Sequence, residues 1–444
     1  MDPGQILIDE SGGRHLVTQC IGRGGQGEAW LTKGGRRIVK LFARARDAEA
    51  VRRQLTFVKR LDLSGLHVAR PLAILKPPLV GYVAEFLDDM APLKSLLEAP
   101  ASGLLRWHLD GGGLRRRLRL LAHAGEALRG LHGQGVVYAD VSHHNVFVSR
   151  PAGEVEAWLI DLDNLTHESD PSRAIHTPGY GAPEVVAGAS GCTTLSDAWS
   201  FAVLTWQTLT LTHPFVGDLV NDGDPDLEVK AFAGELPWTG HSTDRSNACA
   251  AGLPPEHVLA TRLMELARKT FEDGLWDPKR RPGVSAWVER LHTAADLTVA
   301  CAGTGCSGTY FVTEPSCPWC GDPLPPIEVV QFQRWAPDQG LVEGLDRLPH
   351  LPLTAEGLRL SARLTQARSG LEGRAVHVEL RRVEKGIKVQ ARPGFEAWVA
   401  PVGRALEERH PVTERGRVVP ARGWMVLFED PHQPQRVAVL GRRP

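Results

Sequence analysis

Apolar residues in the N-terminal part of the chain occur in short runs separated by turn residues. Residues 6–32 mix such runs with glycines and polar positions, as antiparallel strands do. Two further apolar runs, at residues 37–42 and 80–87, have the length of single strands. Between them, residues 47–61 repeat their apolar positions at near-helical spacing. We therefore expect a sheet with one amphipathic helix in this part of the chain.

The middle of the chain has helical periodicity instead. Residues 114–134 place leucines and alanines along one stripe, which predicts a long helix with an arginine-rich face toward water. Residues 199–211 form the most apolar long stretch, but serine, threonine and glutamine interrupt it. We expect this stretch to be a buried helix and not a membrane span.

After residue 326 the pattern returns to strands. Residues 375–380 alternate apolar and polar positions, and residues 386–391, 395–399 and 424–428 are further strand-like runs. No long amphipathic helix is evident in this part of the sequence. These features predict a β-rich sandwich or barrel.

Length, composition and charge bound the class of protein. A chain of 444 residues suggests about three domains, because single cores stop growing beyond roughly 250 residues. With 42% hydrophobic and 23% charged residues, the sequence is typical neither of a disordered nor of a membrane protein. A net charge of −1 argues against a chain built to bind nucleic acid. The first residues show no secretory signal, so we expect a cytoplasmic protein.

Four of the seven cysteines cluster in the sequence. Cys301 and Cys306 form a C-x4-C pair, and Cys317 and Cys320 form a C-x2-C pair. Without a signal peptide, such a cluster favours metal ligation over disulfides. Zinc is commonly bound by four thiolates in a tetrahedron, so we predict a structural zinc site here. The second pair, in C-P-W-C-G, resembles a zinc-ribbon knuckle, and a redox C-x-x-C pair is the alternative.

Glycines near the N-terminus form a candidate phosphate-binding loop. Gly22, Gly24 and Gly27 fit G-x-G-x-x-G between two expected strands, where missing side chains let backbone amides approach phosphates. Alone this pattern is weak, and a plain hairpin turn would also explain it. A dinucleotide site would need a helix straight after the glycines, but residues 28–32 look like a strand. Lys40 follows as the one lysine of an apolar strand.

Two polar positions and a later acid carry the candidate catalytic chemistry. Asp140 and Asn145 stand in a polar loop between two short apolar runs, and Asp161 ends the next short strand. Together with Lys40 they resemble the machinery of a protein kinase, whose motifs are V-A-I-K, H-R-D-x-x-x-x-N and D-F-G. Residues 177–184 closely match T-x-x-Y-x-A-P-E, a segment that small-molecule kinases lack.

The resemblance implies a role for each matching residue. The glycine loop and Lys40 would orient ATP, and Asp140 would accept the proton of the substrate hydroxyl. Asn145 and Asp161 would hold Mg²⁺. The strand of residues 80–87 would lead into the hinge. There the backbone of Glu85 and Leu87 would meet adenine, and the small Ala84 would line the back of a roomy pocket.

Two further matches lie downstream. Asp197 stands where the family has an acid that braces the backbone of the catalytic loop. Arg281 stands where the family has an arginine that pairs with the glutamate of A-P-E, which is Glu184 in this chain.

The sequence also departs from the family pattern. The helix acid that pairs with the strand lysine is not evident, and either Glu49 or a neutral Gln54 could take that place. Tyr138 and Ala139 replace His-Arg, so activation by phosphorylation of the activation loop is not expected.

Two departures concern the transferring phosphate. Ser142 replaces the usual lysine of the catalytic loop, and His143 or His144 could supply the missing cation. The D-F-G position reads Asp161-Leu162-Asp163, so the glycine is lost there.

The chain is identified as a member of the eukaryotic-like, Hanks-type bacterial serine/threonine protein kinases, with a C-terminal zinc ribbon. The resemblance implies an α+β, two-lobed fold with a β-rich N-lobe (residues 1–87) and a helical C-lobe (residues 88–296). A small zinc ribbon (residues 297–325) and a β-rich interaction domain (residues 326–444) would follow.

The implied function is transfer of the ATP γ-phosphate to Ser or Thr hydroxyls of a protein, in bacterial signalling or stress response. The order of domains resembles that of bacterial kinases that are encoded beside a metal-dependent phosphatase and a von Willebrand A-type protein. The alternative is a pseudokinase scaffold that recruits partners through its C-terminal modules. A preference for tyrosine stays open, because Ser142 removes the lysine typical of serine/threonine kinases.

Overall fold

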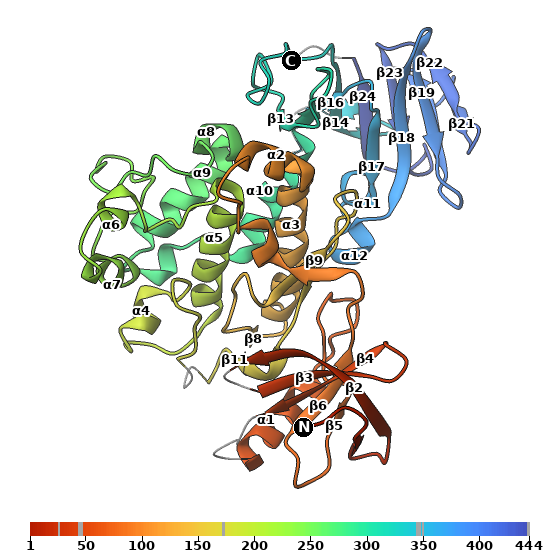
Figure 1. The fold of residues 1–444 in the computed structure, drawn as a ribbon. Coiled ribbons are helices and arrows are strands. Elements are labelled where there is room, and N and C mark those ends of the chain that lie inside the picture. The colour runs from red at the N-terminus through yellow and green to blue at the C-terminus, as the bar shows by residue number, and fades with distance from the viewer. Residues whose placement is uncertain (25–26, 43–47, 171–173, 343–347, 349, 442–444) are drawn as a thin grey trace. The chain divides into compact units, whose positions relative to one another are not determined.

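The computed structural model of the protein describes residues 1–24, 27–42, 48–170, 174–342, 348 and 350–441. The chain divides into two compact units, and Figure 1 labels most of their helices and strands. The first unit comprises residues 1–100, 120–253 and 264–288, and the second comprises residues 101–119, 254–263 and 289–444. Among the described residues, no helix combines the length and the apolar character needed to cross a membrane.

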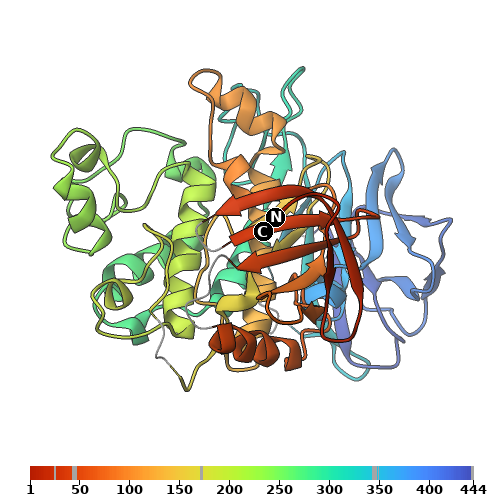
Figure 2. The same cartoon turned by 60° about the horizontal axis from the view of Figure 1, so that its bottom comes forward.

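A six-stranded antiparallel sheet opens the first unit (Figure 2). Its strand order is β1-β2-β3-β4-β6-β5. The strands are β1 (Ile6–Ile8), β2 (Arg14–Gly24), β3 (Gly27–Thr32), β4 (Arg37–Phe42), β5 (Ala73–Ile74) and β6 (Gly81–Glu85). The expected helix is α1 (Ala48–Arg60), while Asp47 lies outside the described residues. Helix α1 buries Leu55 against Ile74, Tyr82 and Ala84 of the sheet, so its apolar stripe faces inward as predicted.

Two small sheets bring two loops of the first unit together. β8 (Val136–Val137) pairs with β11 (Thr166–His167), and β9 (Val146–Ser149) pairs with β10 (Ala157–Leu159). The loop from β8 to β9 and the loop from β10 to β11 therefore begin and end at paired strands. This pairing places the loop that carries Asp140 beside the loop that carries Asp161. β7 (Met90–Pro92) adds a third strand next to β9.

Helices form the rest of the first unit. The buried helix predicted at residues 199–211 is the C-terminal part of α5 (Thr194–Thr210), and its N-terminus is fixed by a reciprocal capping box between Thr193 and Ser196. The short helices of this unit are η1 (Leu93–Leu96), η2 (Leu162–Asn164), α4 (Pro183–Val186), α6 (Asp218–Asn221), α7 (Asp226–Phe232), η3 (Lys269–Asp273) and η4 (Pro278–Arg280). Three helices contribute residues to both units: α3 (Gly113–His132), α9 (Thr261–Arg268) and α10 (Val284–Asp296).

The second unit contains a small hairpin and two larger sheets. Its helices are α2 (Leu104–Asp110), α8 (Pro255–Val258), α11 (Ala362–Thr365) and α12 (Gly370–Gly373). The hairpin pairs β12 (Thr298–Ala300) with β13 (Thr309–Phe311). β12 ends just before the first cysteine pair, and β13 lies between the two pairs. The larger sheets are built from β14 (Glu328–Ala336), β15 (Gly340–Val342), β16 (Leu351–Leu353), β17 (Leu358–Ser361), β18 (Val376–Val383), β19 (Gly386–Ala391), β20 (Ala397–Pro401), β21 (His410–Val412), β22 (Arg417–Val419), β23 (Trp424–Leu427) and β24 (Gln435–Leu440).

The β-rich region is a sandwich. One sheet runs β15-β14-β24-β23-β20-β21, with β16 also paired to β14, and the other runs β17-β18-β19-β22. One cluster of buried residues contains side chains from both sheets, such as Val330, Val378 and Val426. Since the two sheets share this core, the expectation of a sandwich or barrel resolves to the sandwich. The mixed α+β class is confirmed.

Candidate active site

A cavity of about 760 Å³ lies within the first unit. Its lining comes from the sheet and from the loops that follow β8 and β10. Every residue that the sequence assigned to nucleotide, catalysis or magnesium borders it. These residues are Gly22, Gly24, Gly27, Lys40, Ala84, Glu85, Leu87, Asp140, Asn145 and Asp161.

The three glycines of the loop have different reasons to be glycine. A side chain at Gly27 would collide with the backbone of Leu41, since a Cβ there would lie 1.8 Å from its carbonyl oxygen. Gly27 is therefore required by the close pairing of β3 with β4. A Cβ at Gly22 or Gly24 would meet no such obstacle. Their missing side chains instead leave room on the cavity side, which is what phosphate binding by backbone amides needs.

Lys40 is buried and pairs with two carboxylates. Its Nζ lies 3.0 Å from Oδ1 of Asp161 and 3.0 Å from Oδ1 of Asp163. The two helix residues considered as partners lie elsewhere. Glu49 is 83% exposed and pairs with Arg53, and the Gln54 amide donates to the carbonyl of Leu165. The structure thus pairs Lys40 with neither Glu49 nor Gln54.

The charges around Lys40 perturb one another. Burial by itself would lower the pKa of the Lys40 ammonium, but Asp163 and Asp161 outweigh it and raise that pKa. Burial also raises the pKa of Asp161, which Lys40 opposes and which the like charge of Asp163 reinforces. Lys40 therefore stays charged, and a further cation beside Asp161 would be favoured by the local excess of carboxylate.

Asp140 is held by its neighbours in an orderly way. The Asn145 side-chain amide donates to Oδ2 of Asp140 at 2.8 Å and to its backbone carbonyl at 3.0 Å. The hydroxyl of Thr177 donates to Oδ1 of Asp140 at 2.7 Å. Since the nitrogen of the Asn145 amide is committed to Asp140, its oxygen is the atom suited to bind a cation. Asn145 and Asp161 thus offer the oxygen ligands that Mg²⁺ prefers.

The loop that carries Asp140 is held in place by Asp197. Its carboxylate accepts hydrogen bonds from the backbone N–H groups of Tyr138 at 2.7 Å and Ala139 at 2.9 Å, and from His132 at 2.9 Å. Ala139 has a φ of 71°, a left-handed conformation that a non-glycine residue adopts only with support. Asp197 provides that support, in the position that the family resemblance implied.

Tyr138 joins the two loops. Its buried hydroxyl donates to the carbonyl of Ile160, the residue before Asp161. Asp161 itself has a φ of 56°, which turns the chain sharply into η2. The residue that replaces the family's histidine therefore fixes the point from which Asp161 enters the cavity.

Comparisons with known proteins agree with this geometry. The family model described as protein kinase domain matches residues 114–288, and the model of the lipopolysaccharide kinase (Kdo/WaaP) family matches residues 15–177. The serine/threonine-protein kinase pkn2 of Myxococcus xanthus is 29% identical over 254 residues, 53% of this chain and 28% of the relative.

Two further relatives match shorter parts. Serine/threonine-protein kinase PkaB of Streptomyces coelicolor is 30% identical over 227 residues, 46% of this chain and 51% of the relative. Human protein kinase C delta type is 32% identical over 127 residues, 28% of this chain and 19% of the relative. The matched part of the chain, residues 114–288, is a protein kinase domain. The chain spans about half or less of the length of each of these relatives.

The kinase domain places its two loop histidines differently. His143 hydrogen-bonds to the hydroxyl of Tyr180, and burial lowers its pKa to about 4, so it is neutral near pH 7. His144 is exposed and borders the cavity. The hydroxyl of Ser142 is buried without a hydrogen-bond partner among the described residues. Of the two histidines, only His144 is placed to act in the kinase cavity.

The activation segment of the kinase domain is anchored by an ion pair. Arg281 donates to both oxygens of Glu184, each at 2.7 Å, and its side chain is 0% exposed. The guanidinium also donates to the carbonyl of Gly274 and lies 4.8 Å from the ring centre of Trp199. This is the pair that the sequence predicted between the A-P-E glutamate and the terminal arginine.

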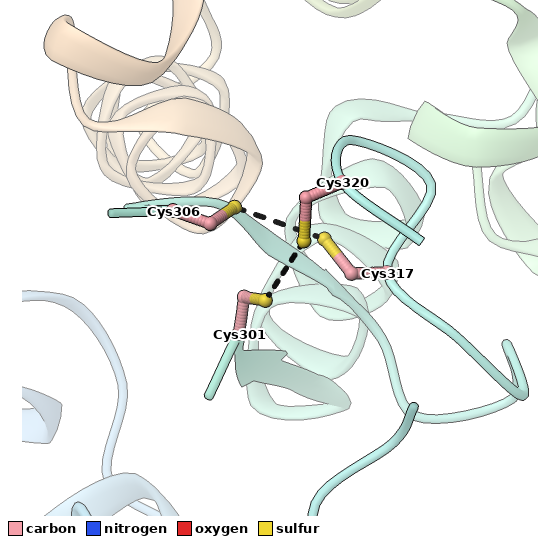
Figure 3. A group of neighbouring side chains, drawn as sticks. All are labelled: Cys301, Cys306, Cys317 and Cys320. Atoms are coloured by element: carbon pink, nitrogen blue, oxygen red, sulfur yellow. Dashed lines mark hydrogen bonds between the residues drawn. The ribbon is translucent and has the colours of Figure 1, made fainter. Parts of the chain in front are cut away.

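The four clustered cysteines converge in the second unit (Figure 3). Their sulfur atoms lie within 4.8 Å of one another, with 3.4 Å between Cys301 and Cys320 and 4.0 Å between Cys306 and Cys317. Tetrahedral zinc–thiolate bonds of about 2.3 Å place sulfurs about 3.8 Å apart. The donor set therefore fits structural zinc, and none of the four cysteines is in a disulfide.

One site residue escaped the sequence analysis. Asp163 was noted only as the loss of the family's glycine, whereas the structure makes it a buried partner of Lys40. Two features of the sequence could have pointed to it. Helix α1 lacks an evident inward acid, and Asp163 is a second acid only two residues after Asp161.

Proposed function

We propose that this chain is an ATP-dependent serine/threonine protein kinase, which transfers the γ-phosphate of ATP to hydroxyls of a protein substrate. The observation that carries the proposal is the shared cavity. Lys40, Asp140, Asn145 and Asp161 come from distant parts of the sequence and all border it. The resemblance to kinases named as serine/threonine-specific supports the same hydroxyl preference.

The proposed roles follow from position. Backbone amides at Gly22 and Gly24 approach the phosphates, and the ammonium of Lys40 contacts the α and β phosphates. Asp140 orients the substrate hydroxyl and accepts its proton. The hydroxyl of Thr177 donates to Oδ1 of Asp140 and so fixes the orientation of the carboxylate. Most of the rate enhancement then comes from positioning and charge neutralisation.

Magnesium fits the oxygens of Asn145 and Asp161, where it would neutralise charge on the phosphates. The adenine would lie at the other end of the cavity. Ala84 is buried and small, so it leaves room for the ring. Glu85 and Leu87 would present backbone groups to the edge of adenine.

The pseudokinase alternative loses support from the same arrangement. The unclear helix acid, Ser142 and the altered Asp161-Leu162-Asp163 favour it in the sequence, but Lys40 has two carboxylate partners without a helix acid, and one of them is Asp163 of that altered motif. The altered catalytic loop is also braced by Asp197 and joined to the metal-binding loop by Tyr138.

The deciding experiment is phosphate transfer from labelled ATP with Mg²⁺, to the protein itself and to a generic basic protein. We expect Asp140→Asn and Asp161→Asn each to lower transfer by about 10²- to 10⁴-fold. Asp170→Asn, an exposed acid of the same segment, is the matched control and should transfer like wild type. If wild type binds ATP with Mg²⁺ but transfers nothing, the scaffold function replaces this proposal.

Finer assignments belong to the same proposal. We place the kinase in the cytoplasm, in a stress-response system with a metal-dependent phosphatase and a von Willebrand A-type protein. We also retain lobes at residues 1–87 and 88–296, a zinc ribbon at 297–325 and an interaction domain at 326–444. Co-purification of tagged full-length protein from its own cells tests the partners, and recovery of neither partner would remove them.

A further inference from the structure

Lys40 sits between two carboxylates that are two residues apart. Both Oδ1 atoms lie 3.0 Å from its Nζ, so distance alone does not show whether Asp161 or Asp163 is the main partner of Lys40. One ammonium cannot serve two carboxylates equally once Asp161 also binds a metal ion. The surroundings of the two side chains show how the roles divide.

The two carboxylates face different surroundings. The side chain of Asp161 is 32% exposed and borders the cavity. The side chain of Asp163 is 8% exposed and is not among the residues that border the cavity. Its Oδ1 also lies 3.5 Å from the hydroxyl of Tyr82, a buried residue of β6. Asp161 therefore faces the nucleotide, and Asp163 faces the interior behind Lys40.

The helix next to Lys40 provides no competing acid. Glu49, in the first turn of α1, points to water and pairs with Arg53. The side-chain amide of Gln54, on the inward side of α1, donates a hydrogen bond to the carbonyl of Leu165. The ion pairs of Lys40 within the described part of the chain are those with Asp161 and Asp163.

We propose that Asp163 is the standing partner of Lys40, a positioning residue that holds the ammonium and thereby leaves Asp161 to the magnesium ion. This inference rests on the proposed kinase function and deepens it. Asp163 touches neither nucleotide nor substrate and acts only through Lys40. With Asp163 neutral, Lys40 would keep a single carboxylate partner, Asp161, and would compete with Mg²⁺ for it.

The assignment also changes what can switch the site. The carboxylate that holds Lys40 lies in η2, in the same turn that positions Asp161, and not in α1. A displacement of α1 would therefore reach the ion pair only through η2, to whose C-cap residue Leu165 the Gln54 side chain donates a hydrogen bond. A displacement of η2 would remove the partner of Lys40 and the metal ligand together.

The test compares how much Mg²⁺ each variant needs. Nucleotide binding is followed by the thermal shift of the full-length protein with ATP at increasing Mg²⁺, and phosphate transfer is measured over the same range. For Asp163→Asn we expect the half-saturating Mg²⁺ concentration to rise by about 10- to 100-fold, the usual effect of removing a group that orients a metal ligand. High Mg²⁺ should restore part of the transfer rate.

Two further variants keep the test decisive. Asp163→Glu retains the charge and should need less Mg²⁺ than Asp163→Asn. Glu49→Gln removes an exposed acid and should match wild type. The proposal is overturned if Asp163→Asn has the wild-type Mg²⁺ requirement. It is also overturned if Glu49→Gln raises that requirement, a result that does not depend on whether Asp163→Asn folds.

The two proposals fail in different ways. If wild type transfers no phosphate but Asp163→Asn shifts the Mg²⁺ dependence of nucleotide binding, Asp163 keeps its role and the kinase function falls. If wild type transfers phosphate and Asp163→Asn behaves identically, the function stands and the role of Asp163 falls. If wild type binds no nucleotide with Mg²⁺, both fall.

Discussion

The kinase cavity and the cysteine cluster differ in what holds their residues together. At the cavity, Lys40 pairs with Asp163, which lies 123 residues further along the chain and behind the cavity wall, and strand pairing with hydrophobic packing brings the two together. In the cluster, the four cysteines fall between positions 301 and 320, beside a core whose fully buried members are Val299, Tyr310 and Cys317. Packing of the fold keeps the residues of the cavity in place, whereas in the cysteine segment a bound metal ion would stabilise the fold.

This difference teaches where each site is vulnerable. A charged residue of the cavity can be neutralised while the surrounding core stays packed, so function is lost before structure. A short segment with a small core has little to replace a lost metal ion, so structure is lost first. The predictions below test this contrast from its strongest consequence to its weakest.

The largest effect should follow loss of zinc. Structural zinc sites contribute on the order of 10–16 kcal/mol of apparent binding free energy, most of which is folding free energy. We expect Cys317→Ser, at a buried position, to abolish zinc binding and to open the segment of residues 297–325 to proteases. Metal analysis and limited proteolysis of the full-length protein measure both effects.

Cys249→Ser is the matched control, because Cys249 lies outside the cluster and should leave zinc content unchanged. If wild-type protein without zinc gave the same cleavage pattern as the zinc-bound protein, the cysteine segment would not depend on metal for its structure. Oxidation of Cys317 with Cys320 in the purified protein would instead favour the redox alternative.

A smaller effect should follow the loss of one buried ion-pair partner in the kinase domain. Glu184→Ala leaves the enclosed Arg281 guanidinium without its carboxylate, which typically destabilises a protein by about 3–5 kcal/mol. Urea unfolding of wild type and variant measures this difference. It would show that the activation segment also contributes to the stability of the first unit.

The neighbouring Arg280 provides the control. Its pair with Asp273, at 3.5 Å, is exposed on both sides, so Arg280→Ala should change stability by less than about 1 kcal/mol. Equal destabilisation by both variants would mean that burial of the Arg281 pair is not what matters.

The smallest effect concerns pH. Burial lowers the pKa of His213 to about 4, and its ring is bonded as a neutral tautomer: Nε2 donates to the carbonyl of Gly179, and Nδ1 accepts from the N–H of Phe215. The unfolded chain binds a proton at this histidine near pH 6.5, so stability should fall as the pH drops from about 6.5 toward 4.

Comparison with His213→Gln isolates that contribution, because glutamine can still donate to Gly179 but does not titrate. We expect wild type to lose on the order of 1 kcal/mol more than the variant between pH 7 and pH 5. Thermal unfolding at both pH values measures it. Parallel losses in the two proteins would place the acid sensitivity elsewhere, such as the zinc thiolates.

Residues that bear chemistry were predictable from the sequence, because each motif needs a particular side chain at a particular spacing. Asp140, Asn145, Asp161 and Lys40 were placed in one site from such spacing and resemblance, and the structure brings them to one cavity. The four cysteines were predictable for the same reason. Their assigned roles stay predictions until the experiments above are done.

The partner of Lys40 was not predictable in this way. Which acid reaches it depends on the rotation of α1 and on the turn at η2, and both are set by packing of distant segments. Strands β14 and β24 were also missed, although they lie at the centre of a sheet. In β14, residues 330–333 alternate apolar and polar positions, which is itself a strand signal, so this strand was open to prediction. Of its two glutamines only Gln333, which is 6% exposed, is buried.

The small side chain of Ala84 has a practical consequence. Ala84 and Tyr82 lie two residues apart on β6 and both border the cavity, and the small side chain of Ala84 takes up little of its space. An ATP analogue enlarged at its adenine would clash with a bulky residue at this position but fit here. If the proposed kinase function holds, such an analogue with a tagged γ-phosphate would label the substrates of this protein in a cell extract, and kinases with a bulky residue at this position would not use it.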